Sequence, residues 1–189
     1  DWGFIKKNNN NDYTLKYFNH SKFYKNYYIY FSPKIKLLRE NFNGDKYNFN
    51  FISGVGYEKK WFVFQIGSGN ESWGAGDDIE LALSTHSNSY NYLLLSSDYG
   101  KIRVRYIHGF LENVNENVNR YITARGIEWT NKSSFIIGLS ETVVYSGINR
   151  ALDIAYMNPI SSHLEIELNN RLNINGNSNS NAVWQFHVD

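Results

Sequence analysis

The chain contains no cysteine, and its 189 residues include only 2 prolines and 1 methionine. Without cysteine, neither a disulfide framework nor a thiolate metal site can form, which favours the bacterial outer membrane or a reducing cytosol over a small secreted scaffold. No apolar run reaches the ~18 residues that a transmembrane helix needs. The net charge of +1 gives no reason to propose a nucleic-acid partner.

Aromatic residues are abundant, at 17 % of the chain, with 15 Tyr, 12 Phe and 5 Trp. Asparagine is also frequent, in runs such as Asn8 to Asn11, which an AT-rich genome would also produce. Tyrosine-rich segments separated by Asn- and Gly-rich turns predict an all-β protein. Tyr and Trp also suit the two interfaces of a membrane barrel, where a ring has one wet end and one apolar end.

Side chains alternate between apolar and polar along much of the chain. In the stretch 78–84, Ile79 and Leu81 alternate with Asp78 and Glu80. This period of two is typical of β-strands. We predict strands over 13–18, 47–57, 61–67, 78–84, 90–97, 101–108, 120–129, 132–145, 162–169 and 182–189. The segment 2–7 is a candidate for a further short strand, and 25–38 is a long aromatic and basic run.

These strands are joined by tight turns at Glu58–Lys60, Asp98–Gly100 and Thr130–Asn131. Pro33 has no N–H to donate, so we expect it at an edge, a bulge or a strand end. The stretch 147–160 has near-helical spacing and predicts a short helix or an irregular insertion. The fold class is therefore all-β: an antiparallel meander of about nine to eleven strands in a single domain, 1–189.

Two architectures fit this meander. One is a soluble β-sandwich with half-buried sheets, and the other is a transmembrane β-barrel, or part of one, with lipid outside and water inside. The residues alone leave both open. In the barrel, short turns belong on the periplasmic side, yet the count of strands puts Lys59–Lys60 and Asp98–Gly100 on opposite sides. Either one strand is miscounted or the segment near 68–77 lies inside the lumen.

Candidate carbohydrate-binding residues gather around a glycine-framed bend. Trp73 can stack on a sugar ring, although a Trp at a barrel rim is also a membrane anchor. Asp77 and Asp78 can accept hydrogen bonds from glycan hydroxyls or bind a divalent ion. The alternative is that they are ordinary turn and lumen residues.

Arginines form a second set of candidates. Arg103, Arg105 and Arg125 could form a basic track that attracts an acidic polysaccharide. The alternative is that they pair with acidic residues and rigidify the lumen. The acidic candidates for that structural role are Glu80, Glu128, Glu141, Glu165 and Glu167.

Glu141 shares its strand face with Leu139 and Val143, where an unpaired carboxylate is costly. We expect a bulge between Leu139 and Val143 that turns Glu141 inward toward an arginine. Its role is structural.

No signature of catalysis is present. The five histidines have no metal-ligand spacing, and Ser140 lacks a Gly-x-Ser-x-Gly elbow. We therefore expect no enzyme activity, no cofactor and no metal.

Two motifs resemble the capsule assembly family of Wzi-like outer-membrane proteins. They are Ser72–Ser84 (SWGAGDDIELALS) and Gly138–Gly147 (GLSETVVYSG), followed by the stretch 152–159. The resemblance implies a porin-sized barrel in the bacterial outer membrane that binds capsular or exopolysaccharide and anchors it at the cell surface. Since 189 residues are few for such a barrel, we expect a partial chain. A porin-like channel for small solutes and a soluble carbohydrate-binding β-sandwich are the alternatives.

Overall fold

The computed structural model describes residues 2–6, 13–40, 44–71, 83, 89–111, 117–170 and 178–188. Its strands are β1 (Trp2–Lys6), β2 (Tyr13–Tyr17), β3 (Asn19–Phe23), β4 (Tyr27–Glu40), β5 (Gly44–Lys59), β6 (Phe62–Gly69), β7 (Tyr90–Asp98), β8 (Ile102–Leu111), β9 (Val118–Thr130), β10 (Ile136–Ile148) and β11 (Ser178–Val188). Two short helices, α1 (Ile154–Met157) and α2 (His163–Asn170), lie between β10 and β11. The all-β prediction is confirmed.

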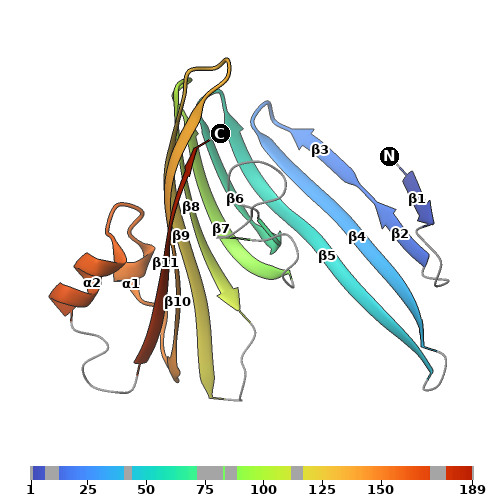
Figure 1. Ribbon diagram of the computed structural model, residues 1–189. Coiled ribbons are helices and arrows are strands. Elements are labelled where there is room, and N and C mark those ends of the chain that lie inside the picture. The colour runs from blue at the N-terminus through green and yellow to red at the C-terminus, as the bar shows by residue number, and fades with distance from the viewer. Residues whose placement is uncertain are drawn as a thin grey trace.

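All the strands belong to one antiparallel sheet, in the order β1-β2-β4-β5-β6-β7-β8-β9-β10-β11, with β3 beside β4. Neighbours along the chain are neighbours in the sheet, so the meander is confirmed. A β-sandwich would need a second sheet, and the described strands form one. In Figure 1 this sheet is strongly curved, and α1 and α2 lie on its outer side.

Pro33 occupies a gap in the sheet. On one side of β4, β3 pairs with Tyr27–Phe31 and β2 pairs with Lys34–Leu37. Pro33 falls between these two ladders, so the missing N–H leaves no hydrogen bond unmade on that side. The expectation of a local edge is confirmed.

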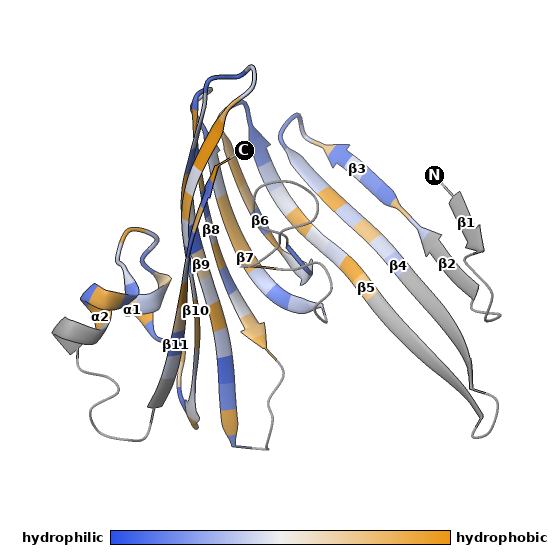
Figure 2. Ribbon diagram, in the orientation of Figure 1, coloured by the Kyte–Doolittle hydropathy of each residue, from blue (hydrophilic) through white to orange (hydrophobic). Residues whose placement is uncertain are grey.

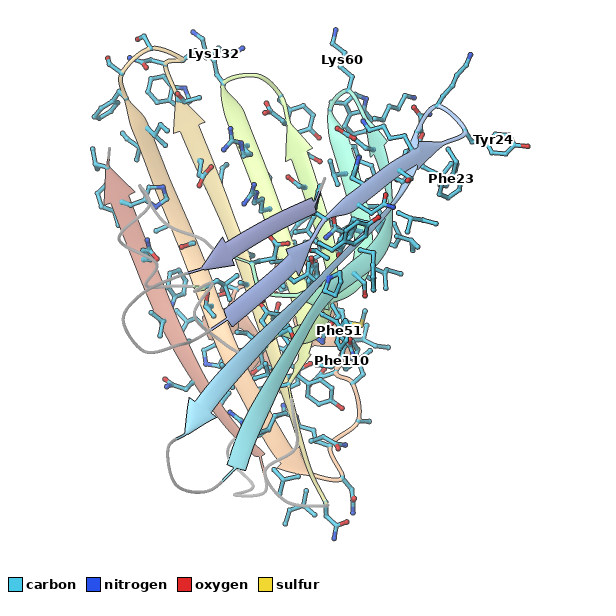
Figure 3. All side chains as sticks on the ribbon, turned by 90° about the vertical axis from the view of Figure 1, so that its right-hand side faces the viewer. Phe23, Tyr24, Phe51, Lys60, Phe110 and Lys132 are labelled. Carbon is cyan, nitrogen blue, oxygen red and sulfur yellow. The ribbon has the colours of Figure 1, made fainter. Side chains whose placement is uncertain are left out.

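The four described turns lie at one end of the sheet. They connect β3 to β4, β5 to β6, β7 to β8 and β9 to β10, and Figure 3 shows Tyr24, Lys60 and Lys132 of three of them together at that end. The sequence-based count placed two of these turns on opposite sides because it inserted a strand over 78–84. β6 pairs directly with β7, so no strand lies between them in the sheet. Of that stretch only Leu83 lies within the described residues.

The two faces of the sheet differ in chemistry, and the alternation is visible as orange and blue bands along the strands in Figure 2. Paired residues of adjacent strands share a face, so the register defines a convex face, on which α1 and α2 pack, and a concave face. Large apolar side chains stand exposed on the convex face: Ile29, Phe31, Phe51, Val55, Ile66, Ile102, Val104, Phe110, Ile127, Trp129, Leu139, Trp184, Phe186 and Val188. The concave face is polar except for a small core in which Leu94, Ile107 and Ala124 pack with Leu83.

Tyrosines of β4 cross the concave face over glycines of β5. A Cβ at Gly56 would overlap the Tyr28 ring, because the ring lies directly on the glycine. The glycine is therefore required by close approach rather than by a turn.

We expect Gly56→Ala to lower the free energy of unfolding by about 1–3 kcal/mol, since it forces the Tyr28 ring out of its place. Urea unfolding measures the change. In a Tyr28→Ala background the same substitution should cost far less, since the atoms it meets are gone. Equal costs in both backgrounds would contradict this account.

The expected strand over 162–169 is wrong. Residues His163–Asn170 form α2 because Ser162 and Glu165 provide a helix start: the Glu165 N–H donates to Ser162 Oγ (3.2 Å), and the Ile166 N–H donates to Ser162 O (3.1 Å). Ile166 is buried against Val143, Tyr145 and Tyr156. The helix or insertion expected over 147–160 is present as α1.

The described residues contain no helix that is long and apolar enough to cross a membrane.

Candidate functional site

A row of ionisable side chains crosses the concave face near the turn end. Asp98 pairs with Arg103 (3.9 Å), Arg103 with Glu128 (3.3 Å), and Glu128 lies 3.8 Å from His187 Nε2. The register brings them together, since each residue is directly opposite the next, with Gly138 between Glu128 and His187. The His187 ring lies over Gly138, where a Cβ would collide with it. The row thus holds alternating donors and acceptors.

An open pocket of about 610 Å³ lies beside this row, between the β7–β8 and β9–β10 turns. Arg103 and Lys132 contribute cations to its lining, Asp98 a carboxylate, and Ser133 and Ser134 lie beside them. Phe135 adds an aromatic surface. Hydroxyls, both signs of charge and an aromatic ring are the groups that a sugar can engage.

The Asn131 side chain shapes the pocket. Its Oδ1 accepts hydrogen bonds from the N–H groups of Ser133, Ser134 and Phe135, each at 3.0 Å. Asn side chains commonly stabilise turns in this way. The loop is therefore held by the Asn131 side chain, and the Ser133 and Ser134 hydroxyls are not needed to hold it.

A second polar row lies beside the first, two residues further along each strand and away from the turns. Arg105, Ser140 and Gln185 share it, and Ser140 and Gln185 are buried. Arg105 Nε, Ser140 Oγ and Gln185 Oε1 have no hydrogen-bond partner among the described residues. Such groups usually find a partner, either water or a ligand.

A tyrosine network occupies the concave face of β4 to β7. Tyr28 O–H donates to Gln65 Oε1 (2.7 Å), and Gln65 Nε2 donates to the hydroxyl oxygens of Tyr30 (3.0 Å) and Tyr92 (2.6 Å). Tyr92 O–H donates to Glu71 Oε1 (2.9 Å). None of these residues was predicted from the sequence, although Gln65 interrupts an apolar strand.

Burial raises the pKa of the Glu71 carboxyl above its ordinary 4.5, although the Tyr92 hydrogen bond and nearby Arg105 oppose the shift. Because the pKa is raised in the folded state, folding favours the protonated Glu71 carboxyl. The protonated carboxyl therefore contributes to stability at low pH, and this contribution is lost as the pH rises through the folded-state pKa.

We therefore expect the free energy of unfolding to fall as the pH rises above about 4.5 and the Glu71→Gln variant to lose part of that fall. Urea titrations of both chains between pH 4 and 8 measure the two slopes. Parallel curves would show that Glu71 ionises equally well in the folded and unfolded states.

The convex face carries a buried ion pair. Arg125 Nε lies 3.2 Å from Glu141 Oε2, both side chains are buried, and the two residues are directly opposite each other in β9 and β10. Both carboxylate oxygens of Glu141 also accept from the His163 N–H at the start of α2 (3.0 and 3.1 Å). Arg125 Nη1 donates to Asn158 O (3.0 Å).

The insert of residues 149–170, called the insert below, is fastened to the same face by further side chains. Tyr106 O–H donates to Tyr156 O (3.1 Å), and Tyr121 O–H donates to Arg150 O (2.9 Å). The Tyr156 ring stacks on Tyr145 with centroids 4.3 Å apart. Backbone carbonyls of the insert thus accept from strand side chains, as a segment outside the sheet requires.

The residues expected from sequence are only partly brought together. Trp73, Asp77, Asp78 and Glu80 lie outside the described residues. Arg103 and Arg105 are on the concave face, and Arg125 is on the convex face, so these three do not form one track.

Pairing with carboxylates is confirmed for Arg103 with Glu128 and for Arg125 with Glu141. The bulge expected at Glu141 is absent, because pairing from Ile136 to Ile148 is continuous. Glu141 stays on the convex face and Arg125 meets it there.

Glu165 and Glu167 belong to α2, so the strand alternation that made them lumen candidates does not apply. The expected structural role of Glu141 is supported by its contacts.

The described residues contain no group of three or more His, Asp or Glu side chains that could hold a metal ion. Comparison with known proteins gives no match to a family model, to a curated protein or to a solved structure.

Proposed function

We propose that this chain forms part of the wall of an outer-membrane β-barrel that binds capsular or exopolysaccharide and anchors it at the cell surface. The observation that carries the proposal is the convex face. Strands β4, β5, β6, β8, β9, β10 and β11 expose large apolar side chains there, while the concave face carries Tyr, Gln, Arg, Glu and His. Lipid outside and water inside require this division.

The turn end supports a membrane interface. Trp61 and Tyr99 stack there with centroids 6.1 Å apart, and Trp129 lies 6.5 Å from Phe135 in an edge-on contact. All four rings are exposed on a surface that also carries Lys60 and Lys132. Rings at the headgroup level with cations beyond them are typical of a barrel rim.

Polysaccharide binding is assigned to the concave face. The pocket between the β7–β8 and β9–β10 turns provides donors and acceptors from Arg103, Lys132 and Asp98. A glycan lying along this face replaces the water that would otherwise satisfy these groups.

The test is capture of polysaccharide by cells that express the full-length gene, compared with a deletion strain scored for retained capsule. We expect the deletion to shed capsule into the medium and the protein to retain glycan. Replacing Arg103 and Lys132 together by Gln should reduce the captured glycan several-fold. The matched control is Lys25→Gln, which removes a cation from another turn of the same end.

Normal capsule retention with no captured glycan would overturn the anchoring role. Conductance of the purified protein in a planar bilayer would then indicate a channel for small solutes.

A further inference from the structure

The charges that line the pocket between the β7–β8 and β9–β10 turns do not balance. Its lining carries two cations, Arg103 and Lys132, and the single carboxylate of Asp98. Glu128, which follows Arg103 in the ionisable row, is not part of the lining. A ligand that enters the pocket therefore meets more positive than negative charge.

Arg103 is the less available of the two cations. It lies 3.9 Å from Asp98 and 3.3 Å from Glu128, so two carboxylates share its guanidinium. Asp98 Oδ1 also accepts a hydrogen bond from the Gly100 N–H (2.7 Å). The charges of Arg103 and Asp98 are thus compensated before any ligand arrives, although Arg103 was the cation expected from sequence.

The Lys132 ammonium is the uncompensated cation. Figure 3 shows Lys132 at the turn end, and its Nζ reaches the opposite turn, where a Cβ at Gly100 would meet it at 3.3 Å. Among the described residues, no carboxylate forms an ion pair with Lys132. Because Gly100 has no side chain, the three N–H donors of the ammonium stay available to a ligand.

The backbone of the turn gives no reason for a lysine at this position. Lys132 has a φ of 66°, in the left-handed region that Gly and Asn adopt at lower cost. The turn is held by Asn131 Oδ1 and by the Thr130 hydroxyl, which accepts from the Lys132 N–H (2.9 Å). What distinguishes Lys132 is the position of its ammonium in the pocket.

The rest of the lining suits a sugar ring that carries a negative charge. Ser133 and Ser134 are exposed and offer hydroxyls, and Phe135 offers an aromatic surface. The volume of about 610 Å³ is ample for such a ligand, since ligand pockets commonly measure ~300–1,000 Å³. Asp98 and Arg103 belong to the concave face, so the pocket adjoins the face assigned to the glycan.

We propose that this pocket binds an acidic sugar residue of the polysaccharide, with the sugar carboxylate on Lys132 Nζ. The sugar hydroxyls then meet Ser133 and Ser134, and the apolar side of its ring lies on Phe135. The inference rests on the proposed polysaccharide binding and names its ligand class, a uronate-containing glycan. One free ammonium matches the single charge of a uronate, whereas a phosphate monoester carries about −1.5 to −2.

The test is isothermal titration calorimetry of the full-length protein in detergent with two probes. One is oligogalacturonate, and the other is the same oligosaccharide after reduction of its carboxylates to alcohols. We expect oligogalacturonate to bind at least ~tenfold more tightly, because its carboxylate makes a charge-assisted hydrogen bond.

Lys132→Asn should abolish this preference, because Asn suits the left-handed backbone and carries no charge. Lys132→Arg keeps the charge and should keep the preference. The matched control is Lys25→Gln, which removes another exposed lysine with a left-handed φ (41°) from the same end of the sheet. Lys25 does not line the pocket, so the preference should remain in that variant.

A preference that survives Lys132→Asn would overturn the inference, and so would equal binding of the two probes. Loss of the preference in Lys25→Gln would also overturn it, because the attraction would then be diffuse rather than specific to the pocket. Failure to bind either probe would have the same consequence. Capture of capsule by cells, measured separately, shows in each case whether the anchoring function stands without the acidic ligand.

Discussion

Replacing Ile66 by Arg should block stable insertion into a bilayer. Ile66 lies on β6 in the convex face and is 49 % exposed, so no packed core is disturbed by the larger side chain. If that face contacts lipid, an Arg near the bilayer midplane costs about 2–4 kcal/mol. The folded fraction recovered in phospholipid vesicles, read as the heat-modifiable band on electrophoresis, measures the effect.

The matched control for this prediction is Asn181→Arg on β11. Asn181 is also exposed but lies on the concave face, directly opposite Val144. Arg there should leave the folded fraction unchanged, because a lumen position is in contact with water. If Ile66→Arg leaves the folded fraction as high as the control does, the convex face is in contact with water. The proposal that this chain forms part of a barrel wall would then be wrong.

The alternation that predicts the sheet is a local property, and this explains why most strands could be predicted. On β8, Ile102 and Val104 alternate with Arg103 and Arg105, so one face of the strand is apolar whichever strand pairs with it. Which strand pairs with it, and in which register, depends on residues far away in the sequence. Arg105 and Arg125 read as one basic set in sequence, yet the register places Arg125 opposite Tyr106, on the other face.

The segment 162–169 shows where local reasoning selects the wrong period. Leu164 and Ile166 alternate with His163 and Glu165, which favours a strand. The Ser162-x-x-Glu165 spacing favours a helix start, and the helix buries Ile166 in the cluster that contains Tyr156. That cluster forms only when α1 packs on β10, so the local sequence does not reveal it.

The same reasoning explains Glu141. Its polar side chain on an apolar strand face was recognisable from sequence, and so was its need for an arginine. A bulge is what the local pattern predicts, because that pattern does not reveal that another segment covers the convex face. The insert supplies the burial and the His163 N–H, so the strand stays regular.

Removing one partner of the Arg125–Glu141 pair should be among the most damaging changes in this chain. Glu141→Leu leaves Arg125 buried without its carboxylate and frees the N–H at the start of α2. A buried charge that loses its partner typically costs about 3–5 kcal/mol. Urea unfolding measures the global loss, and limited proteolysis at the insert shows whether α1 and α2 detach first.

The double variant Arg125→Met/Glu141→Leu identifies the source of that loss. If an uncompensated charge is responsible, removing both charges should recover most of the stability, since apolar replacements of buried pairs are often neutral or better. If the loss came mainly from the His163 hydrogen bond, the double variant would stay as unstable as Glu141→Leu. Recovery of stability together with continued proteolysis of the insert would separate the two roles of Glu141: its charge compensates Arg125, and its oxygens hold α2 in place.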